Sequence, residues 1–192
     1  MAQGTKEIHF EEHIEKYLHE KEGYFVINPD AYDKDLCLIP SSLIAFIEET
    51  QPKQYKALKD QYGAQVNEKI VQNVAKQISQ NNTLDVLRNG IKDRGQKLRL
   101  AYFKPANNKT PEHEEWYAKN RLGIVRQLRY SNRNNNEIDF VIFVNGIPVV
   151  TAELKNALTG QNHHNAIKQF MQDRDPKGEQ FLEFGRCLVH FA

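Results

Sequence analysis

The sequence predicts an α/β fold in which helices flank a mixed sheet with a mostly antiparallel core hairpin. Apolar residues keep helical spacing through the first half of the chain, up to about residue 90. From residue 97 the apolar pattern alternates as in strands, and Asn145-Gly146 joins two apolar runs as a short hairpin turn does. The chain then continues as strand, helix and strand, which completes a helix-flanked sheet.

The first two helices are predicted from their apolar stripes and from a capping residue. Residues 8–20 carry an apolar stripe, with Glu11 and Glu15 four positions apart on a neighbouring stripe. A second helix is expected from Ser41, whose hydroxyl can cap it, to about Glu49. Residues 8–20 are therefore predicted as an amphipathic helix, and residues 41–49 as a second helix.

Helical spacing returns over residues 54–80, where Gly63 marks a kink or short break. The segment LDVLRNG then forms a short helix that ends at Gly90, a residue suited to a helix C-terminus. After it the period changes: residues 97–103 and 123–130 alternate and are predicted as strands.

The remaining elements follow from turn signals and apolar runs. Thr110 and Pro111 open a short helix, SNRNNN is a turn, and two apolar runs flank Asn145-Gly146. Residues 162–173 are predicted as a helix and RCLVHFA as a buried strand. Because that strand reaches the last residue without a polar tail, we expect the chain to be part of a longer protein.

Composition excludes several classes of protein. The chain has 192 residues, and 40% of them are hydrophobic, which argues against disorder. It has neither an apolar run long enough to cross a bilayer nor an amino-terminal secretion signal, so we expect a cytoplasmic protein. Cys37 and Cys187 stand far apart without metal-ligand spacing, which favours reduced core thiols over a disulfide.

Charge is spread unevenly although the formal net charge is only +1. Residues 1–60 hold 7 Lys and Arg against 12 Asp and Glu, whereas residues 90–133 hold 11 against 4. A polyanion should therefore meet the second region, although a solvated surface explains the same counts equally well. Gly95 in KDRGQK allows a close backbone approach to phosphate, so Lys92, Arg94 and Lys97 are candidate contacts for the phosphates of a nucleic acid such as DNA. Arg126, on the strand predicted over 123–130, is a further candidate.

Three charges interrupt the apolar hairpin EIDFVIFVNGIPVVTAELKN, residues 137–156: Asp139, Glu153 and Lys155. A charge taken out of water is costly unless it is paired or binds a metal. Two carboxylates and a lysine on one face can hold Mg²⁺ and hydrolyse a phosphodiester. The alternative is a surface ion pair between Glu153 and Lys155, with Asp139 as a strand-end cap.

The hairpin register discriminates between these readings. A two-residue loop with regular strands places Asp139 across from Ala152 and sends Glu153 to the opposite face. A three-residue loop or a bulge, with Gly146 in a left-handed conformation, puts Asp139 and Glu153 on the same face. We therefore predict an odd loop or a bulge.

An ordered set of segments identifies a family resemblance over essentially the whole chain: FEEHIEKYL, TLDVLRNGIKDRGQKLRLAYFKP, NRLGIVRQLRYS, the hairpin, AIKQF and LVHFA. The chain resembles the amino-terminal nuclease domain of the R (restriction, or motor) subunit of Type I restriction enzymes, in the PD-(D/E)xK nuclease superfamily. The resemblance implies a single restriction-endonuclease-like domain over residues 1–192, with a helical part at 38–90 and a catalytic sheet at 97–192.

The resemblance also implies roles for individual residues. Asp139 and Glu153 would be ligands of Mg²⁺, and Lys155 the catalytic lysine. Glu11 is the better match to an auxiliary acid, with Glu15 second. Gln169 matches a glutamine that many relatives place at the site, but Asp173 stands where many of them have an aromatic residue, which puts the role of Gln169 in doubt.

The expected activity is that of a Type I site-specific deoxyribonuclease acting on double-stranded DNA. In proteins of this kind the R subunit works with methyltransferase and specificity subunits, and ATP and S-adenosylmethionine serve the parent complex. No phosphate-binding G-x-x-x-x-G-K-[ST] loop occurs in this chain, so ATP use would belong to the parent protein. The rival interpretations are a docking or DNA-clamping module without cleavage, and a repair or recombination nuclease of the same fold.

Overall fold

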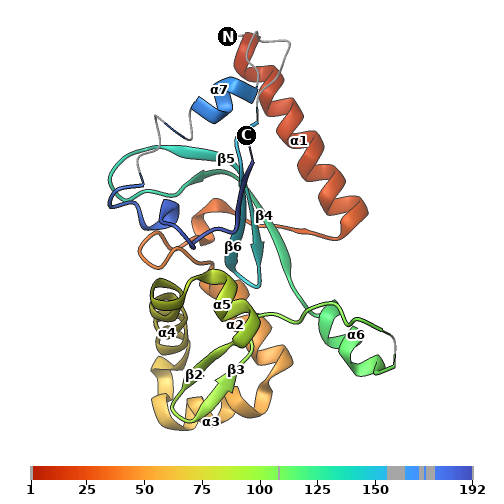
Figure 1. Cartoon of the computed structure of the whole chain (residues 1–192), viewed down its shortest axis with the longest axis vertical. Helices are drawn as coiled ribbons and strands as arrows, with labels where there is room; N and C mark the ends of the chain where they lie inside the picture. The colour runs from red at the N-terminus through yellow and green to blue at the C-terminus, as the bar shows by residue number, and fades with distance from the viewer. Residues whose placement is uncertain (1, 108, 155–162, 169–170, 172–175, 192) are drawn as a thin grey trace. The chain divides into compact units, whose positions relative to one another are not determined.

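The computed structural model describes residues 2–107, 109–154, 163–168, 171 and 176–191. It confirms the α/β fold class, with helices and a mixed sheet (Figure 1). The chain divides into two compact units: one contains Met1–Asp30, Leu122–Phe143 and Pro148–Ala192, and the other contains Ala31–Arg121 and Val144–Ile147. The single-domain reading of residues 1–192 stays a prediction.

The first unit holds most of a five-stranded sheet in the order β1-β4-β5-β6-β7. Strand β1 runs parallel to β4, and β6 runs parallel to β7, so the sheet is mixed around the central hairpin. Helical segments accompany the strands. The bounds are α1 (Ala2–Glu22), β1 (Phe25–Val26), β4 (Leu122–Arg129), β5 (Glu137–Val144), β6 (Ile147–Ala152), α7 (His163–Lys168), η5 (Gln180–Leu182) and β7 (Val189–Phe191).

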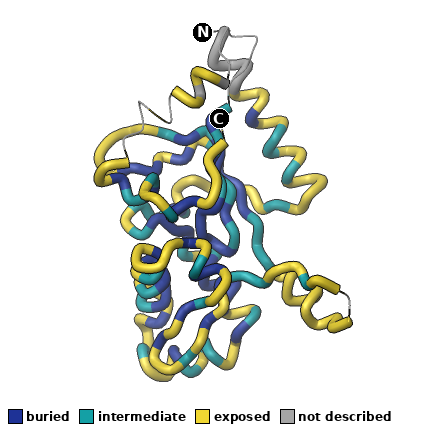
Figure 2. Tube along the Cα trace, viewed as in Figure 1, coloured by how far each residue is buried: buried dark blue, intermediate teal, exposed yellow. Residues whose placement is uncertain are grey.

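The core of this unit lies in β4, β5 and the segments beside them, which run dark along the tube in Figure 2. Val125, Val141 and Phe143 are completely buried, and the ring of Tyr130 stacks on that of Phe181 with 5.5 Å between centroids. Burying such side chains contributes about 1.5–3 kcal/mol each, so the central strands anchor the unit.

The second unit is mainly helical and carries the small antiparallel hairpin β2–β3. Figure 1 shows α2, α3 and α4 grouped with this hairpin. The bounds are η1 (Pro29–Ala31, of which Ala31 belongs to this unit), α2 (Pro40–Thr50), α3 (Pro52–Tyr62), η2 (Gly63–Gln65), α4 (Val66–Asn81), α5 (Thr83–Asn89), β2 (Ile91–Asp93), β3 (Gln96–Leu98) and α6 (Pro111–Ala118). Its core includes Leu43, Phe46, Leu58, Ile70 and Val74, all completely buried.

Glycine and proline set the helix boundaries of this unit. Gly63 ends α3 with a φ of 60°, and Gly90 ends α5 with a φ of 69°, which confirms both predicted breaks. The predicted Ser41 cap is wrong: α2 begins at Pro40 with Ile39 as its N-cap, and no side chain caps it. Proline at the first position loses nothing there, because its missing N–H would have had no partner inside the helix.

The strand predicted for residues 97–103 is too long, because β3 ends at Leu98. The next residue, Arg99, pairs with a side chain and not with a strand. Gln51 receives a hydrogen bond from the Arg99 amide at 2.7 Å and donates one to the Arg99 carbonyl at 2.9 Å. A buried glutamine thus satisfies backbone groups that a strand would have paired.

The carboxyl-terminal predictions are partly wrong. RCLVHFA gives only the short strand β7, whose residues are exposed, while Arg186 and Cys187 before it are buried. The reason is its place at the edge of the sheet: among the described residues β7 has β6 on one side and no strand on the other, so it is not enclosed as a central strand is. The helix predicted over 162–173 is described only as α7, and the other positions except Met171 lie outside the described residues.

Two further expectations concern the cysteines and membranes. Cys37 and Cys187 are both buried and are not joined in a disulfide, which confirms the prediction of reduced core thiols. Within the described part of the chain, no helix has the length and apolar character needed to span a bilayer.

Candidate active site

The hairpin β5–β6 turns through Asn145 and Gly146, whose φ angles are 51° and 81°. Two left-handed residues in a two-residue loop are the signature of a type I′ turn, which suits the twist of the flanking strands. The prediction of an odd loop is therefore wrong, although Gly146 does adopt the predicted left-handed conformation. If Asp139 and Glu153 share a face of the sheet, the extra residue that this register needs must be a bulge within β5 or β6.

Asn145 is also a structural clamp, a role that its sequence context did not reveal. Its side chain is completely buried; it donates to the carbonyl of Leu100 at 2.8 Å and accepts from the amide of Arg121 at 2.7 Å. Its own amide donates to the Arg121 carbonyl at 2.9 Å. Within the second unit the hairpin tip is thus fixed by hydrogen bonds to the backbone of Leu100 and Arg121.

Asp139 lies in β5 and is half-buried. Its Oδ2 accepts a hydrogen bond from the backbone amide of Leu154 at 2.8 Å. Leu154 directly follows Glu153, whose amide donates to the carbonyl of Phe191 at 3.0 Å. The structure therefore brings the carboxylate of Asp139 to the backbone beside Glu153.

Glu153 is 2% exposed, so its carboxyl group is buried at the end of β6. Lys155 and Gln169, and Asp173 beyond them, lie outside the described residues. In the described ranges no group of three or more His, Cys, Asp or Glu side chains is arranged to hold a metal ion. Of the residues predicted to bind a metal, Asp139 and Glu153 both lie in the described part of the chain.

Glu11 is on α1 and is 3% exposed. Nε2 of Gln127, on β4, donates to both of its carboxylate oxygens at 2.8 and 2.9 Å. Gln127 has a φ of 51° inside a strand, a conformation that is uncommon for residues other than glycine. Sequence reasoning missed Gln127, and no local signal marks it, because its partner is more than 100 positions away.

Glu15 has a different environment from Glu11. Its Oε2 forms an ion pair with Nε of Arg126 at 3.0 Å, and both side chains are partly exposed. Arg126, a candidate DNA contact, is thereby engaged within the unit. Both acids border a pocket of about 640 Å³ whose lining residues are Ile8, Glu11, Glu15, Val26, Ile27, Asn28, Pro29, Arg126 and Gln127.

The other three candidate DNA contacts lie on hairpin β2–β3 of the second unit. Lys92 and Lys97 are directly opposite each other and exposed. The guanidinium of Arg94 lies 4.3 Å from the centre of the Tyr62 ring, and the Tyr62 hydroxyl donates to Asp93 at 2.6 Å. That hydrogen bond to Asp93 is the main cause that raises the pKa of Tyr62. Hairpin β2–β3 thus exposes Lys92 and Lys97, while Arg94 and Asp93 contact Tyr62 of α3.

Comparison with known proteins places the chain in a family. The family model described as Type I restriction enzyme R protein N terminus matches residues 6–192, nearly the whole chain. Searches among curated proteins and among solved structures found no match. The chain therefore belongs to the family of the Type I restriction enzyme R protein N terminus.

Proposed function

We propose that this chain is a Mg²⁺-dependent endonuclease domain that hydrolyses phosphodiester bonds of double-stranded DNA within a Type I restriction complex. Membership of the R protein family supports a nuclease role. The observation that carries the proposal is the hydrogen bond that joins the Asp139 carboxylate to the backbone beside buried Glu153.

The direction of the β6 backbone supports a common face for the two carboxylates. The carbonyl of Val149 accepts from Leu188, and the amide of Glu153 donates to Phe191, so both residues point toward β7. A type I′ turn instead directs the residue after it, Ile147, toward β5. Residues two apart in a regular strand point the same way, so we infer one extra residue, a β-bulge, near Pro148.

With one extra residue in β6, Asp139 pairs with Glu153 instead of Ala152. The burial pattern agrees with this register: Val141 and Phe143 of β5 are buried, and so are Val149, Thr151 and Glu153 on the matching face of β6. Paired residues of antiparallel strands have Cβ atoms about 4.5–5.5 Å apart, which is close enough for two carboxylates to share a cation.

The donor set fits Mg²⁺, because this ion prefers carboxylate oxygens and usually keeps several waters. Asp139 and Glu153 would hold it at the end of the hairpin. When bound, Mg²⁺ polarises the phosphate and lowers the pKa of a coordinated water. The Asp139 carboxylate is held by the Leu154 amide, which fixes its orientation before substrate arrives.

Lys155 would orient the attacking water or offset negative charge in the transition state. We assign the auxiliary acid to Glu11 and not to Glu15, because Glu15 forms an ion pair with Arg126, whereas the Gln127 amide that binds Glu11 carries no charge. Gln169 is a further candidate on the strength of the resemblance alone. The exposed Lys92 and Lys97, with Arg94, would contact DNA phosphates without reading sequence.

The surrounding machinery belongs to the same proposal. The parent protein would supply an ATP-driven motor, and methyltransferase and specificity subunits would supply recognition, with S-adenosylmethionine used by the complex. The assembly would work in the cytoplasm, where its DNA substrate is found. This chain would contribute the cleavage chemistry.

The test is Mg²⁺-dependent nicking of supercoiled plasmid by the full-length parent in its reconstituted complex. Asp139→Ala and Lys155→Ala are compared with wild type, and ATP hydrolysis is followed in parallel. We expect cleavage to be lost while ATP hydrolysis persists, because the chemistry resides in the hairpin. Undiminished cleavage in both variants would overturn the site and leave the chain a DNA-holding or docking role.

A further inference from the structure

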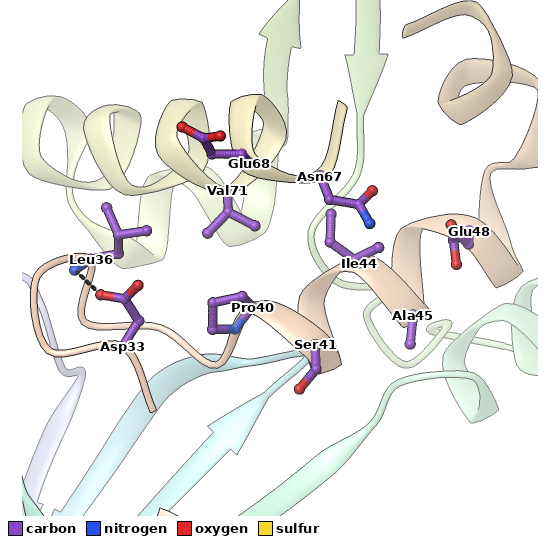
Figure 3. Close-up of a pocket in the computed structure, with 10 residues that line it drawn as sticks. All are labelled: Asp33, Leu36, Pro40, Ser41, Ile44, Ala45, Glu48, Asn67, Glu68 and Val71. Carbon is purple, nitrogen blue, oxygen red and sulfur yellow. Dashed lines mark hydrogen bonds between the residues drawn. The ribbon is translucent and has the colours of Figure 1, made fainter. Parts of the chain in front are cut away.

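A second pocket, of about 380 Å³, lies in the helical unit between α2, α4 and the loop before α2 (Figure 3). In Figure 3 Leu36, Ile44 and Val71 converge between the two helices and form an apolar floor. The pocket is of the size that accepts a ligand or one or two large side chains. Its lining residues are Asp33, Leu36, Pro40, Ser41, Ile44, Ala45, Glu48, Asn67, Glu68 and Val71.

The charged residues of this pocket are all acidic: Asp33, Glu48 and Glu68, with no Lys, Arg or His among its lining residues. They come from three different segments, the loop, α2 and α4. Oδ1 of Asp33 accepts from the amides of Asp35 and Leu36, both at 2.9 Å, which fixes its side chain beside the floor. Oε1 of Glu68 accepts from Gln72 at 2.8 Å.

Tyr55 of α3 contacts the pocket residues Asn67 and Glu48. The Tyr55 hydroxyl donates to Oδ1 of Asn67 at 2.7 Å, which holds this pocket residue against α3. Burial of the Tyr55 hydroxyl, followed by the nearby Glu48 carboxylate, raises the pKa of Tyr55 to about 12. An ordinary tyrosine is already neutral at pH 7, and this shift widens the margin, so Tyr55 adds no negative charge to the pocket.

We infer that this pocket is a docking site for a protein segment that presents Lys or Arg next to aliphatic side chains. The acidic residues Asp33, Glu48 and Glu68, spread along the pocket, complement basic side chains of a partner, and Leu36, Ile44 and Val71 complement aliphatic ones. Charge patterns of this kind select partners by rejecting wrong ones. The acidic rim repels phosphate, so DNA is not the occupant, and the inference stands independently of the proposed nuclease function.

The probe is a fluorescein-labelled peptide of alternating leucine with lysine and arginine, titrated against the full 192-residue chain and followed by fluorescence anisotropy. Two matched peptides carry serine in place of leucine, or glutamate in place of the basic residues. We expect binding of the first peptide and at least about tenfold weaker binding of each control, because both the charges and the apolar floor contribute. Equal binding of the serine peptide, or equal competition by spermidine, would show a simple cation site and overturn the inference.

Variants of the chain locate the binding. The double variant Glu48→Lys with Glu68→Lys should weaken binding about tenfold or more, because it reverses the sign of the rim. The matched double variant Glu22→Lys with Asp60→Lys changes net charge equally but alters exposed residues outside the pocket. Ala45→Phe, which adds a large side chain at a lining position of the pocket and keeps every charge, should also weaken binding. Equal loss in the matched double variant, or full binding by Ala45→Phe, would sink the inference; thermal unfolding verifies that each variant folds.

Discussion

Two hairpins of this protein have turns of the same kind but place their charged side chains differently. Arg94-Gly95 joins β2 to β3 with φ angles of 43° and 82°, and Asn145-Gly146 joins β5 to β6 with 51° and 81°. Hairpin β2–β3 exposes Lys92 and Lys97. Hairpin β5–β6 leads instead into Glu153, which is almost completely buried.

The difference shows that a turn fixes how two strands are joined but not which side chains become buried. Exposed lysines cost little in water and can meet phosphates without a built site. A buried carboxylate is expensive and needs compensation from hydrogen bonds, a partner charge or a metal. Hairpin β2–β3 also buries a carboxylate, that of Asp93, to which the Tyr62 hydroxyl donates. The exposed lysines, and not burial alone, therefore separate the hairpin proposed for contact with DNA from the one proposed for chemistry.

The largest expected effect is a difference in DNA cleavage between variants of two buried carboxylates, Glu153 after β6 and Asp93 in β2. Glu153→Gln keeps the shape and removes the charge, so plasmid nicking by the reconstituted parent complex should fall by about a hundredfold or more. Asp93→Asn is the matched control, because Asp93 is 4% exposed and pairs with Tyr62. It should keep its cleavage activity. Equal loss of cleavage in both variants would mean that changing any buried carboxylate disturbs the protein, and Glu153 would then have no specific role in cleavage.

A stability difference should follow for the two turn glycines. Alanine in a left-handed turn costs about 1–2 kcal/mol at either position. At Gly146 the new Cβ would also clash with the carbonyl of Ile39 and lie 2.9 Å from the amide nitrogen of Leu43, whereas at Gly95 it meets nothing within 4 Å. Such overpacking adds about 1–3 kcal/mol.

Urea unfolding of the 192-residue chain measures this difference. We expect Gly146→Ala to lose at least about 1 kcal/mol more unfolding free energy than Gly95→Ala. Equal losses would indicate that the hairpin tip shifts to accommodate the methyl group.

The smallest expected effect is that of Lys97→Glu, which should raise the unfolding free energy of the chain but weaken its binding to DNA. Lys97→Glu replaces a like-charged cross-strand pair with an attractive one opposite Lys92, which should stabilise the chain by about 0.2–1 kcal/mol. The same change should weaken binding to duplex DNA and lower its salt dependence, because a phosphate contact is lost. Anisotropy titrations with a labelled duplex at several salt concentrations, beside urea unfolding, measure both quantities.

The matched variant for that experiment is Lys56→Glu, an exposed lysine on α3. It changes net charge equally and should leave DNA binding nearly unaltered. If Lys56→Glu weakens binding as much as Lys97→Glu, the effect is one of total charge, and the β2–β3 hairpin has no special role.

Local patterns predicted many of the elements. The breaks at Gly63 and Gly90, the short helix after Thr110 and the Asn145-Gly146 hairpin turn could be read from the sequence, because each depends on residues close together in the chain. Two other predictions were wrong: the Ser41 cap, because a neighbouring residue starts the helix, and the full strand over 97–103, because a residue distant in the chain binds its backbone. Pro40 starts the helix one residue earlier, and Gln51 takes the backbone of Arg99 from 48 positions away.

The candidate site divides in the same way. The sequence by itself singled out Asp139, Glu153 and Lys155 as charges in apolar company, and the family resemblance gave roles to them and to Glu11. Only the tertiary structure decided that Gln127 binds Glu11, that Arg126 binds Glu15, and that the Leu154 amide binds Asp139. It also decided that three acids of the helical unit border one pocket. Periodicity encodes which face of an element is buried, but the partners that meet there are set by packing between segments distant in the chain.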